Sequence, residues 1–142
     1  MSQCTKPEAL KIQVGGDHYS KLKIGPTEFA MANGWDPCAT NILKYVTRHE
    51  SKNGRPDLDK ALHYADLRAE LCSYRWHHLS HSVSIEAYCE ANKLGAYESA
   101  VLQALDRAVW ENSVRAYLEL KVALDHLIYE RYGKPPNHDE VL

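Results

Sequence analysis

Residues 36–70 read DPCATNILKYVTRHESKNGRPDLDKALHYADLRAE, which has the pattern of two helices joined by a tight turn. Asp36 suits the N-cap of the first helix, and Pro37 suits its first helical position. Apolar residues recur at helical spacing on one face of both helices. The first helix is predicted to end near residue 50, and the second to run from Pro56 to about residue 78. Because the SKNG turn between them is short, we expect the two helices to pack antiparallel as a hairpin.

The rest of the chain also has helical patterns. Capping and turn residues predict further helices at about 27–33, 85–92, 96–111 and 114–132. Strand patterns are weak, with at most a short extended piece at 12–14 or 22–24. We therefore expect an all-α protein, built of two helical hairpins packed in one compact domain. The predicted divisions are a flexible leader at 1–13, a helical region at 14–80, a second helical region at 81–133 and a tail at 134–142.

The second half of the chain resembles a degenerate copy of the first. FAMANGWDPCATNILKYVTR (29–48) aligns with YCEANKLGAYESAVLQALDR (88–107) at a constant offset. After a small shift, KALHYADLRAE (60–70) resembles KVALDHLIYER (121–131). A degenerate tandem repeat and a chance similarity between amphipathic helices both remain open. The apolar pattern recurs but the charged turn does not: Lys44, Lys52 and Gly54 become Gln103, Glu111 and Ser113.

The composition argues against several classes of protein. Hydrophobic residues make up 44% of the 142 residues and charged residues 25%, as in an ordinary folded domain. The formal net charge of −2 gives no global basic field that would attract nucleic acid. Charged residues interrupt every apolar run, so no membrane span is expected, and the N-terminus lacks the apolar core of a secretion signal. The four cysteines form no C-x-x-C pair, which favours a reduced cytosolic compartment.

The turn after the first predicted helix concentrates positive charge, with five cationic residues between positions 44 and 60. On the helix before it, Lys44 and Arg48 share one face, where Arg48 suits bidentate contact with a phosphate. The helix after it begins with free backbone N–H groups, and a tyrosine from either helix could stack on a base. We therefore predict a site for a phosphate-bearing ligand. The predicted ligand-binding residues are His18, Tyr19, Asn41, Lys44, Tyr45, Arg48, Lys52, Lys60, His63 and Tyr64.

Two parts of this prediction have simpler alternatives. A solvated helix face, eased by nearby carboxylates and by the helix C-terminus, explains the same cations. The GGDHY stretch (15–19) could form a backbone nest in which His18 contacts an anion, or it could be a plain glycine turn. A nucleotide-kinase loop of the G-x-x-x-x-G-K-[ST] type is absent from the chain, so the residues give no support to kinase activity.

No catalytic, metal or cofactor site is predicted. His77 and His81 in WHHLSH (76–81) have the i, i+4 spacing of metal ligands if the helix continues that far. A third ligand is not evident, so surface or core histidines are the default interpretation. The chain has no G-x-S-x-G nucleophile motif, and its residues identify no cofactor.

Two stretches carry a resemblance to a known family: GGDHYSKLKIGPTEFAMANG (15–34) and NILKYVTRHESKNGRPDLDKALHY (41–64). Over residues 14–70 the chain resembles the SaV-like family of small phage and prophage proteins. The resemblance implies a phage origin and a role in the host cytoplasm, but no secure activity. Members are sometimes labelled nucleotide kinases, and the missing phosphate-binding loop argues against that label here.

We therefore expect a phage accessory protein that binds a phosphorylated small molecule, with a nucleotide as the preferred class, and that sequesters a host defence signal. One alternative is a protein–protein inhibitor that docks on a host factor. Another is a nucleotide-processing phosphohydrolase or phosphotransferase, with His18 and Asp17 as acid and base. The expected partners are the ligand, a host protein and a second copy of the chain in a homodimer, without a membrane.

Overall fold

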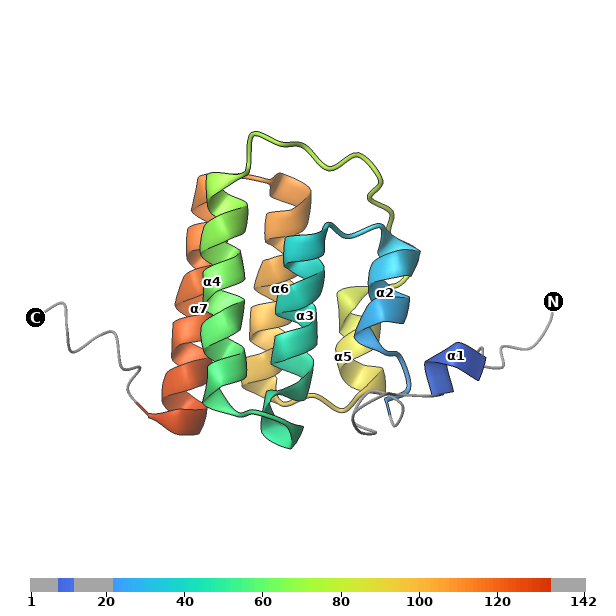
Figure 1. The fold of residues 1–142 in the computed structure, drawn as a ribbon, viewed down its shortest axis with the longest axis vertical. Coiled ribbons are helices and arrows are strands. Elements are labelled where there is room, and N and C mark those ends of the chain that lie inside the picture. Colours follow the sequence, from blue (N-terminus) through green and yellow to red (C-terminus); the bar gives the residue numbers. More distant parts are fainter. Residues whose placement is uncertain (1–7, 12–21, 134–142) are drawn as a thin grey trace, which may run out of the picture.

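The computed structural model describes residues 8–11 and 22–133, and within them every regular element is a helix (Figure 1). The elements are α1 (Glu8–Lys11), α2 (Pro26–Asn33), α3 (Pro37–Arg48), the 3-10 helix η1 (His49–Ser51), α4 (Arg55–Glu70), α5 (Ile85–Ala91), α6 (Ala96–Glu111) and α7 (Val114–Tyr132). The all-α prediction is confirmed. Residues 22–24 form a bend, so the extended piece predicted there is wrong, and residues 12–14 lie outside the described residues.

Helices α2 to α7 form two layers of three. In Figure 1, α2, α3 and α4 lie in front of α5, α6 and α7. Helix α3 packs on α4 and α6 on α7, which are the two predicted hairpins, and α4 on α7 and α3 on α6 join the layers. The core between the layers consists of apolar side chains from both halves. Among the described helices, none combines the length and the hydropathy that crossing a bilayer requires.

Local capping explains why three of the helices begin where the sequence predicts. Asp36 accepts a hydrogen bond from the backbone N–H of Ala39 at 2.9 Å, and Pro37 takes the first helical position of α3. Ser84 and Ser113 cap α5 and α7 in the same way. Each such cap stabilises a helix by about 1 kcal/mol, which is enough to fix the residue at which it begins.

The end of α4 differs from the prediction, because the helix stops at Glu70 rather than near residue 78. The buried guanidinium of Arg68 donates to the carbonyls of Leu71 and Tyr74, at 2.9 and 3.2 Å, and to Asp36 at 3.2 Å. These bonds satisfy carbonyls that a continuing helix would use itself. Residues 71–84 therefore cross without helix to α5, and the i, i+4 helical spacing proposed for two histidines in WHHLSH does not exist.

The element order supports a tandem repeat. Helices α5, α6 and α7 each begin 59 residues after α2, α3 and α4, at 85 and 26, 96 and 37, and 114 and 55. Buried positions recur at the same offset, as in Leu58 and Tyr117, or Ala61 and Leu120. The small shift that sequence alignment introduced in α4 is therefore wrong, since helix starts and burial both keep one offset throughout. Single-residue matches misled the alignment, whereas the buried positions fix it.

Two asparagines at this offset join the halves reciprocally. Asn33 at the end of α2 donates to the carbonyl of Val83 at 2.7 Å and accepts from its N–H at 2.8 Å. Asn92, which follows α5, makes the same pair of bonds with Ile24, at 2.7 and 3.1 Å. Val83 also follows Ile24 by 59 residues. Each half therefore clamps the chain segment that leads into the short helix of the other half.

Replacing either asparagine by alanine leaves a backbone N–H and a carbonyl without their partner. We expect Asn33→Ala and Asn92→Ala each to lower the free energy of unfolding by about 1–3 kcal/mol, with the more buried Asn33 at the upper end. Urea denaturation followed by circular dichroism measures this. Gln103→Ala, which removes an exposed amide from α6, should stay within about 0.5 kcal/mol of the parent. If the two asparagine variants lose no more unfolding free energy than Gln103→Ala, the asparagine bonds do not hold the halves together.

Candidate functional site

The predicted cations gather around one aromatic ring. Tyr45 on α3 is only 9% exposed, and its ring lies beneath three positive groups. The Lys44 Nζ and the Arg48 Cζ each lie 4.8 Å from the ring centroid, and the Lys60 Nζ, from α4, lies 5.6 Å from it. Such contacts stabilise each cation by about 0.5–1 kcal/mol. The hairpin therefore brings together cations from two helices, as the sequence predicted.

Two further rings pack around Tyr45 and the three cations over it, Lys44, Arg48 and Lys60, which we call the cationic cluster. The rings of Tyr45 and Tyr64 stack, with centroids 6.1 Å apart and planes 22° from parallel, and His63 lies edge-on to Tyr64 at 5.8 Å. Because Tyr45 is buried between Tyr64 and the cations, it is placed to hold the amines rather than to stack on an external base.

Arg48 has an internal partner. Its Nε lies 3.1 Å from Oδ2 of Asp57, its Nη2 lies 3.3 Å from Oδ1, and the Asp57 side chain is completely buried. Asn53 in the turn donates to the same carboxylate at 3.3 Å. Asp57 stands in the first turn of α4, where the helix dipole favours negative charge. Part of the simpler interpretation is therefore right, because a carboxylate of the chain already occupies this helix start.

Lys44 and Lys60 differ from Arg48 in this respect. Among the described residues, neither amine forms an ion pair with a carboxylate. Burial lowers the pKa of Lys44, and the nearby charges of Arg48 and Lys60 lower it further, against the opposing effect of Asp57. A lowered amine pKa means that its surroundings destabilise the protonated form, and a bound anion would stabilise that form.

The other predicted residues lie at different distances from the cluster. Asn41 stands one turn before Lys44 on α3 and lines a separate pocket beside that helix. Lys52 is exposed in the turn that follows η1, and His63 is exposed on α4. His18 and Tyr19 lie outside the described residues, so their part in the site stays a prediction.

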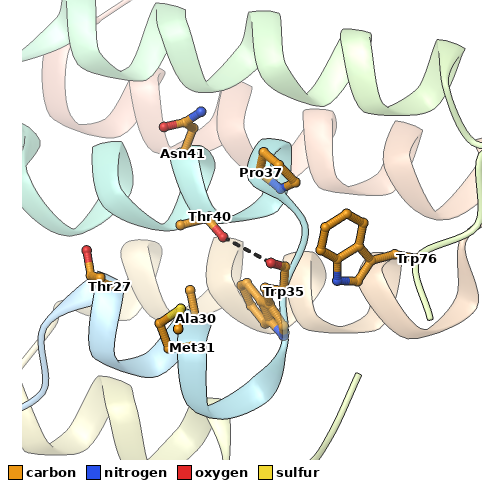
Figure 2. Close-up of a pocket in the computed structure, with 8 residues that line it drawn as sticks. All are labelled: Thr27, Ala30, Met31, Trp35, Pro37, Thr40, Asn41 and Trp76. Atoms are coloured by element: carbon orange, nitrogen blue, oxygen red, sulfur yellow. Dashed lines mark hydrogen bonds between the residues drawn. The ribbon is translucent and has the colours of Figure 1, made fainter. Parts of the chain in front are cut away.

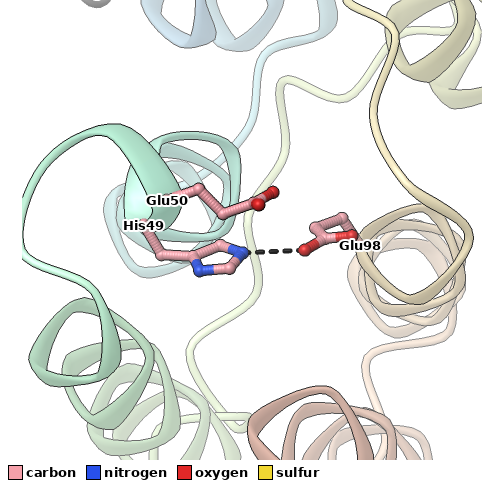
Figure 3. Close-up of side chains that lie close together, drawn as sticks. All are labelled: His49, Glu50 and Glu98. Carbon is pink, nitrogen blue, oxygen red and sulfur yellow. Dashed lines mark hydrogen bonds and ion pairs between the residues drawn. The ribbon is translucent and has the colours of Figure 1, made fainter. Parts of the chain in front are cut away.

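A buried polar network beside the cluster was not predicted from sequence. His49, next to Arg48 in the chain, is 1% exposed, and its two ring nitrogens lie 2.6 Å from the Tyr132 hydroxyl and 2.8 Å from Oε2 of Glu98. Arg131 also binds Glu98, at 2.9 and 3.0 Å. Figure 3 shows His49, in η1 at the end of α3, pointing toward Glu98 on α6. The network therefore joins the first half of the chain to the second at the residue that directly follows Arg48.

The ionisation of Glu98 gives this network its strength. Burial by itself would raise the pKa of Glu98, but hydrogen bonds from His49 and Arg131 outweigh that effect and lower the pKa to about 2. An ionised carboxylate only accepts hydrogen bonds, so Nε2 of His49 is the donor. Glu50 lies close enough to join these two residues around a cation. However, both nitrogens of His49 and both oxygens of Glu98 already have protein partners, so the arrangement is that of an internal network.

The fold and the site define a small helical protein in which Lys44, Arg48 and Lys60 gather over the ring of Tyr45. Its residues 13–66 match a family described as protein of unknown function (DUF3310). That region is about two-fifths of the chain and spans every predicted ligand-binding residue from His18 to Tyr64. Comparison with curated proteins and with solved structures found no match. The match supplies no function, and the SaV-like assignment stays a prediction.

Removing Arg48 should destabilise the protein, because it leaves the buried Asp57 carboxylate without its cation. We expect Arg48→Ala to lower the free energy of unfolding by about 3–5 kcal/mol. Arg107 is the residue at the equivalent position of α6 and is exposed. Arg107→Ala should therefore cost less than about 0.5 kcal/mol. Urea denaturation of both variants measures the difference, and equal losses would show that the Arg48–Asp57 pair is not needed for stability.

The Glu98 network should make stability depend on pH in acid. Because the pKa of Glu98 falls from its ordinary value of 4.5 to about 2 on folding, its contribution is fully present above pH 4.5 and is lost as the pH falls toward 2. We expect Glu98→Gln to be less stable than the parent by roughly 3 kcal/mol at pH 6, and this gap to close on acidification. Glu119→Gln, an exposed carboxylate on α7, is the control. A gap that stays constant from pH 6 to pH 2 would contradict the assignment.

Proposed function

We propose that this protein binds a phosphorylated small molecule, and that nucleotides are the class its cationic face fits best. The observation that carries the proposal is the pair of amines, on Lys44 and Lys60, that converge on Tyr45 and form no ion pair with a carboxylate among the described residues. Gathering like charges at one point costs folding free energy. A bound phosphate would repay that cost, since lysine amines and phosphate oxygens form charge-assisted hydrogen bonds.

The second half of the chain is an internal control for this argument. At the constant offset of 59 the helices and the core recur, but the cluster does not. Lys44, Tyr45, Lys60 and Tyr64 correspond to Gln103, Ala104, Glu119 and Ala123. Because the second half forms the same three-helix layer without these residues, the layer does not require them. Their presence in the first half therefore favours a role in binding.

The resemblance to phage proteins supports a narrower form of the proposal. In that form the ligand is a signalling nucleotide of a host defence system, and the protein acts in the host cytoplasm by sequestering it. The enzyme alternative has no independent support, because its proposed acid and base, His18 and Asp17, lie outside the described residues.

A protein partner is a second candidate, and a specific observation favours it. Helix α7 exposes Val114, Leu118, Val122 and Tyr129. The equivalent positions of α4 are all polar: Arg55, Asp59, His63 and Glu70. An exposed apolar stripe on only one of two related helices is typical of an interaction surface. The partner would be a host factor or the second chain of a homodimer.

The ligand proposal is tested by reversing the charges of Lys44 and Lys60. Binding of ATP, GTP and sodium tripolyphosphate is measured by thermal shift and by isothermal titration calorimetry. We expect the parent to be stabilised by about 2.7 kcal/mol at a ligand concentration 100 times the dissociation constant. Lys44→Glu with Lys60→Glu should weaken binding at least roughly 100-fold. Its melting temperature should fall by only a few degrees, because neither lysine fills the core and each cation–ring contact contributes about 0.5–1 kcal/mol.

The control is Gln103→Glu with Arg107→Glu, which adds negative charge at two exposed positions of α6, equivalent to Lys44 and Arg48, and should bind like the parent. Unchanged affinity in the double lysine variant would place the site elsewhere. A parent protein that binds none of the three probes at about 1 mM would overturn the proposal. Light scattering on the same sample would then test the α7 surface for self-association, since a homodimer has twice the mass of the monomer.

A further inference from the structure

A pocket of about 330 Å³ lies beside α3 (Figure 2). We call it the tryptophan pocket. It is lined by residues of α2, of α3 and of residues 71–84, the segment between α4 and α5 that we call the crossover. Its lining includes Thr27, Met31, Trp35, Thr40, Asn41 and Trp76. The volume lies at the lower end of the range for small-molecule sites, and the lining is mostly apolar with a few polar groups, as such sites usually are.

The two tryptophans are fixed in place before any ligand arrives. The indole N–H of Trp76 donates to the carbonyl of Gly34 at 2.5 Å. Gly34 has a φ of +66°, and a Cβ there would lie 1.9 Å from the carbonyl oxygen of His78, so the crossover packs directly on this glycine. Trp35 packs edge-on against Phe29, with ring centroids 4.9 Å apart. Because the walls are already ordered, little conformational entropy would be lost on binding.

The pocket and the cluster share helix α3. Asn41 lines the pocket and precedes Lys44 by three residues, a rise of roughly 4.5 Å along the helix axis. Residues at this spacing lie on the same side of a helix, so one small ligand could reach both. The Asn41 amide offers a donor and an acceptor, the pair of groups that a nucleobase edge also presents.

The second half lacks these groups, as it lacks the cluster. Trp35 and Asn41 correspond to Leu94 and Ala100, while Met31 and Thr27 correspond to Glu90 and Glu86. The pseudo-equivalent layer therefore forms without an aromatic wall or an amide at these positions. The fold does not require the tryptophan pocket any more than it requires the cationic cluster.

We propose that the tryptophan pocket is the subsite for a planar heteroaromatic ring, a purine or a pyrimidine, of the ligand whose phosphate meets Lys44 and Lys60. The inference rests on the proposed function and deepens it by assigning the base. Indole faces stack on bases of any sequence, which explains how an apolar pocket recognises such a ring. The ring enters beside Trp76, and Asn41 binds its polar edge between the pocket and the lysines.

The test compares a nucleotide with its phosphates alone. Calorimetry measures the affinity for ATP, UTP and sodium tripolyphosphate in the parent, in Trp76→Ala and in Trp110→Ala. Trp110, on α6, is a matched control because it is 39% exposed, against 40% for Trp76. We expect Trp76→Ala to weaken nucleotide binding roughly 10- to 100-fold and to leave tripolyphosphate binding within about twofold. Trp110→Ala should change neither affinity.

Because Trp76 also holds the crossover, Asn41→Ala is a second variant, placed on a partly exposed helix position. It should weaken nucleotide binding about 5-fold or more and leave tripolyphosphate binding unchanged. Equal affinity of the parent for ATP, UTP and tripolyphosphate would overturn the pocket and leave the proposed function standing. If Trp76→Ala and Asn41→Ala each weaken the binding of ATP, UTP and tripolyphosphate equally, the pocket is likewise overturned and the proposed function stands. Nucleotide binding that survives Lys44→Glu with Lys60→Glu but not Trp76→Ala would support the pocket and overturn the phosphate site.

Discussion

The packing of one three-helix layer on the other is the constraint on which the remaining features depend. Helix α3 buries Ile42, Leu43 and Val46 in the core that both halves share, and the equivalent residues of α6 are buried in the same core. Either layer alone would expose this apolar face to water, at a cost of about 25 cal/mol for each Å². The halves therefore stabilise each other, and the polar contacts between them act only once this surface is covered. Because the core side chains come from both layers, the position of each hairpin is set by the other.

Sequence reasoning succeeded where the determining interaction is local. Asp36 and Pro37, Ser84 and Ser113 fix helix starts within a few residues of themselves, so these starts could be predicted. The end of α4 could not, because Arg68 stops the helix by binding Asp36, 32 residues earlier, together with carbonyls of the turn. A residue-by-residue alignment of the repeat failed in α4 for a related reason. Buried positions keep the constant offset, but they keep only apolar character and not residue identity.

The site divides in the same way. Helical spacing placed Lys44 and Arg48 on one face, and the short turn brought Lys60 to them. The pairing of Arg48 with Asp57 does not follow from the sequence, which shows several carboxylates near these cations but not that one of them, Asp57, is completely buried. His49 gave no signal, since its partners are 49 and 83 residues away. The two indoles of the tryptophan pocket are likewise 41 residues apart, and only the fold brings them together.

The two halves contribute different side chains to the cationic cluster and to the His49 network, and this division does not follow the family match. Residues 13–66 contain the cations and His49, but Glu98, Arg131 and Tyr132 all come from the second half. His49 directly follows Arg48, so the second half fixes the backbone at the point where the cationic turn begins. A chain limited to the matched region would lack the carboxylate and the hydroxyl that bind the two ring nitrogens of His49. The second half therefore does more than cover an apolar face. It also supplies the hydrogen bonds that hold His49, the residue next to Arg48, in place.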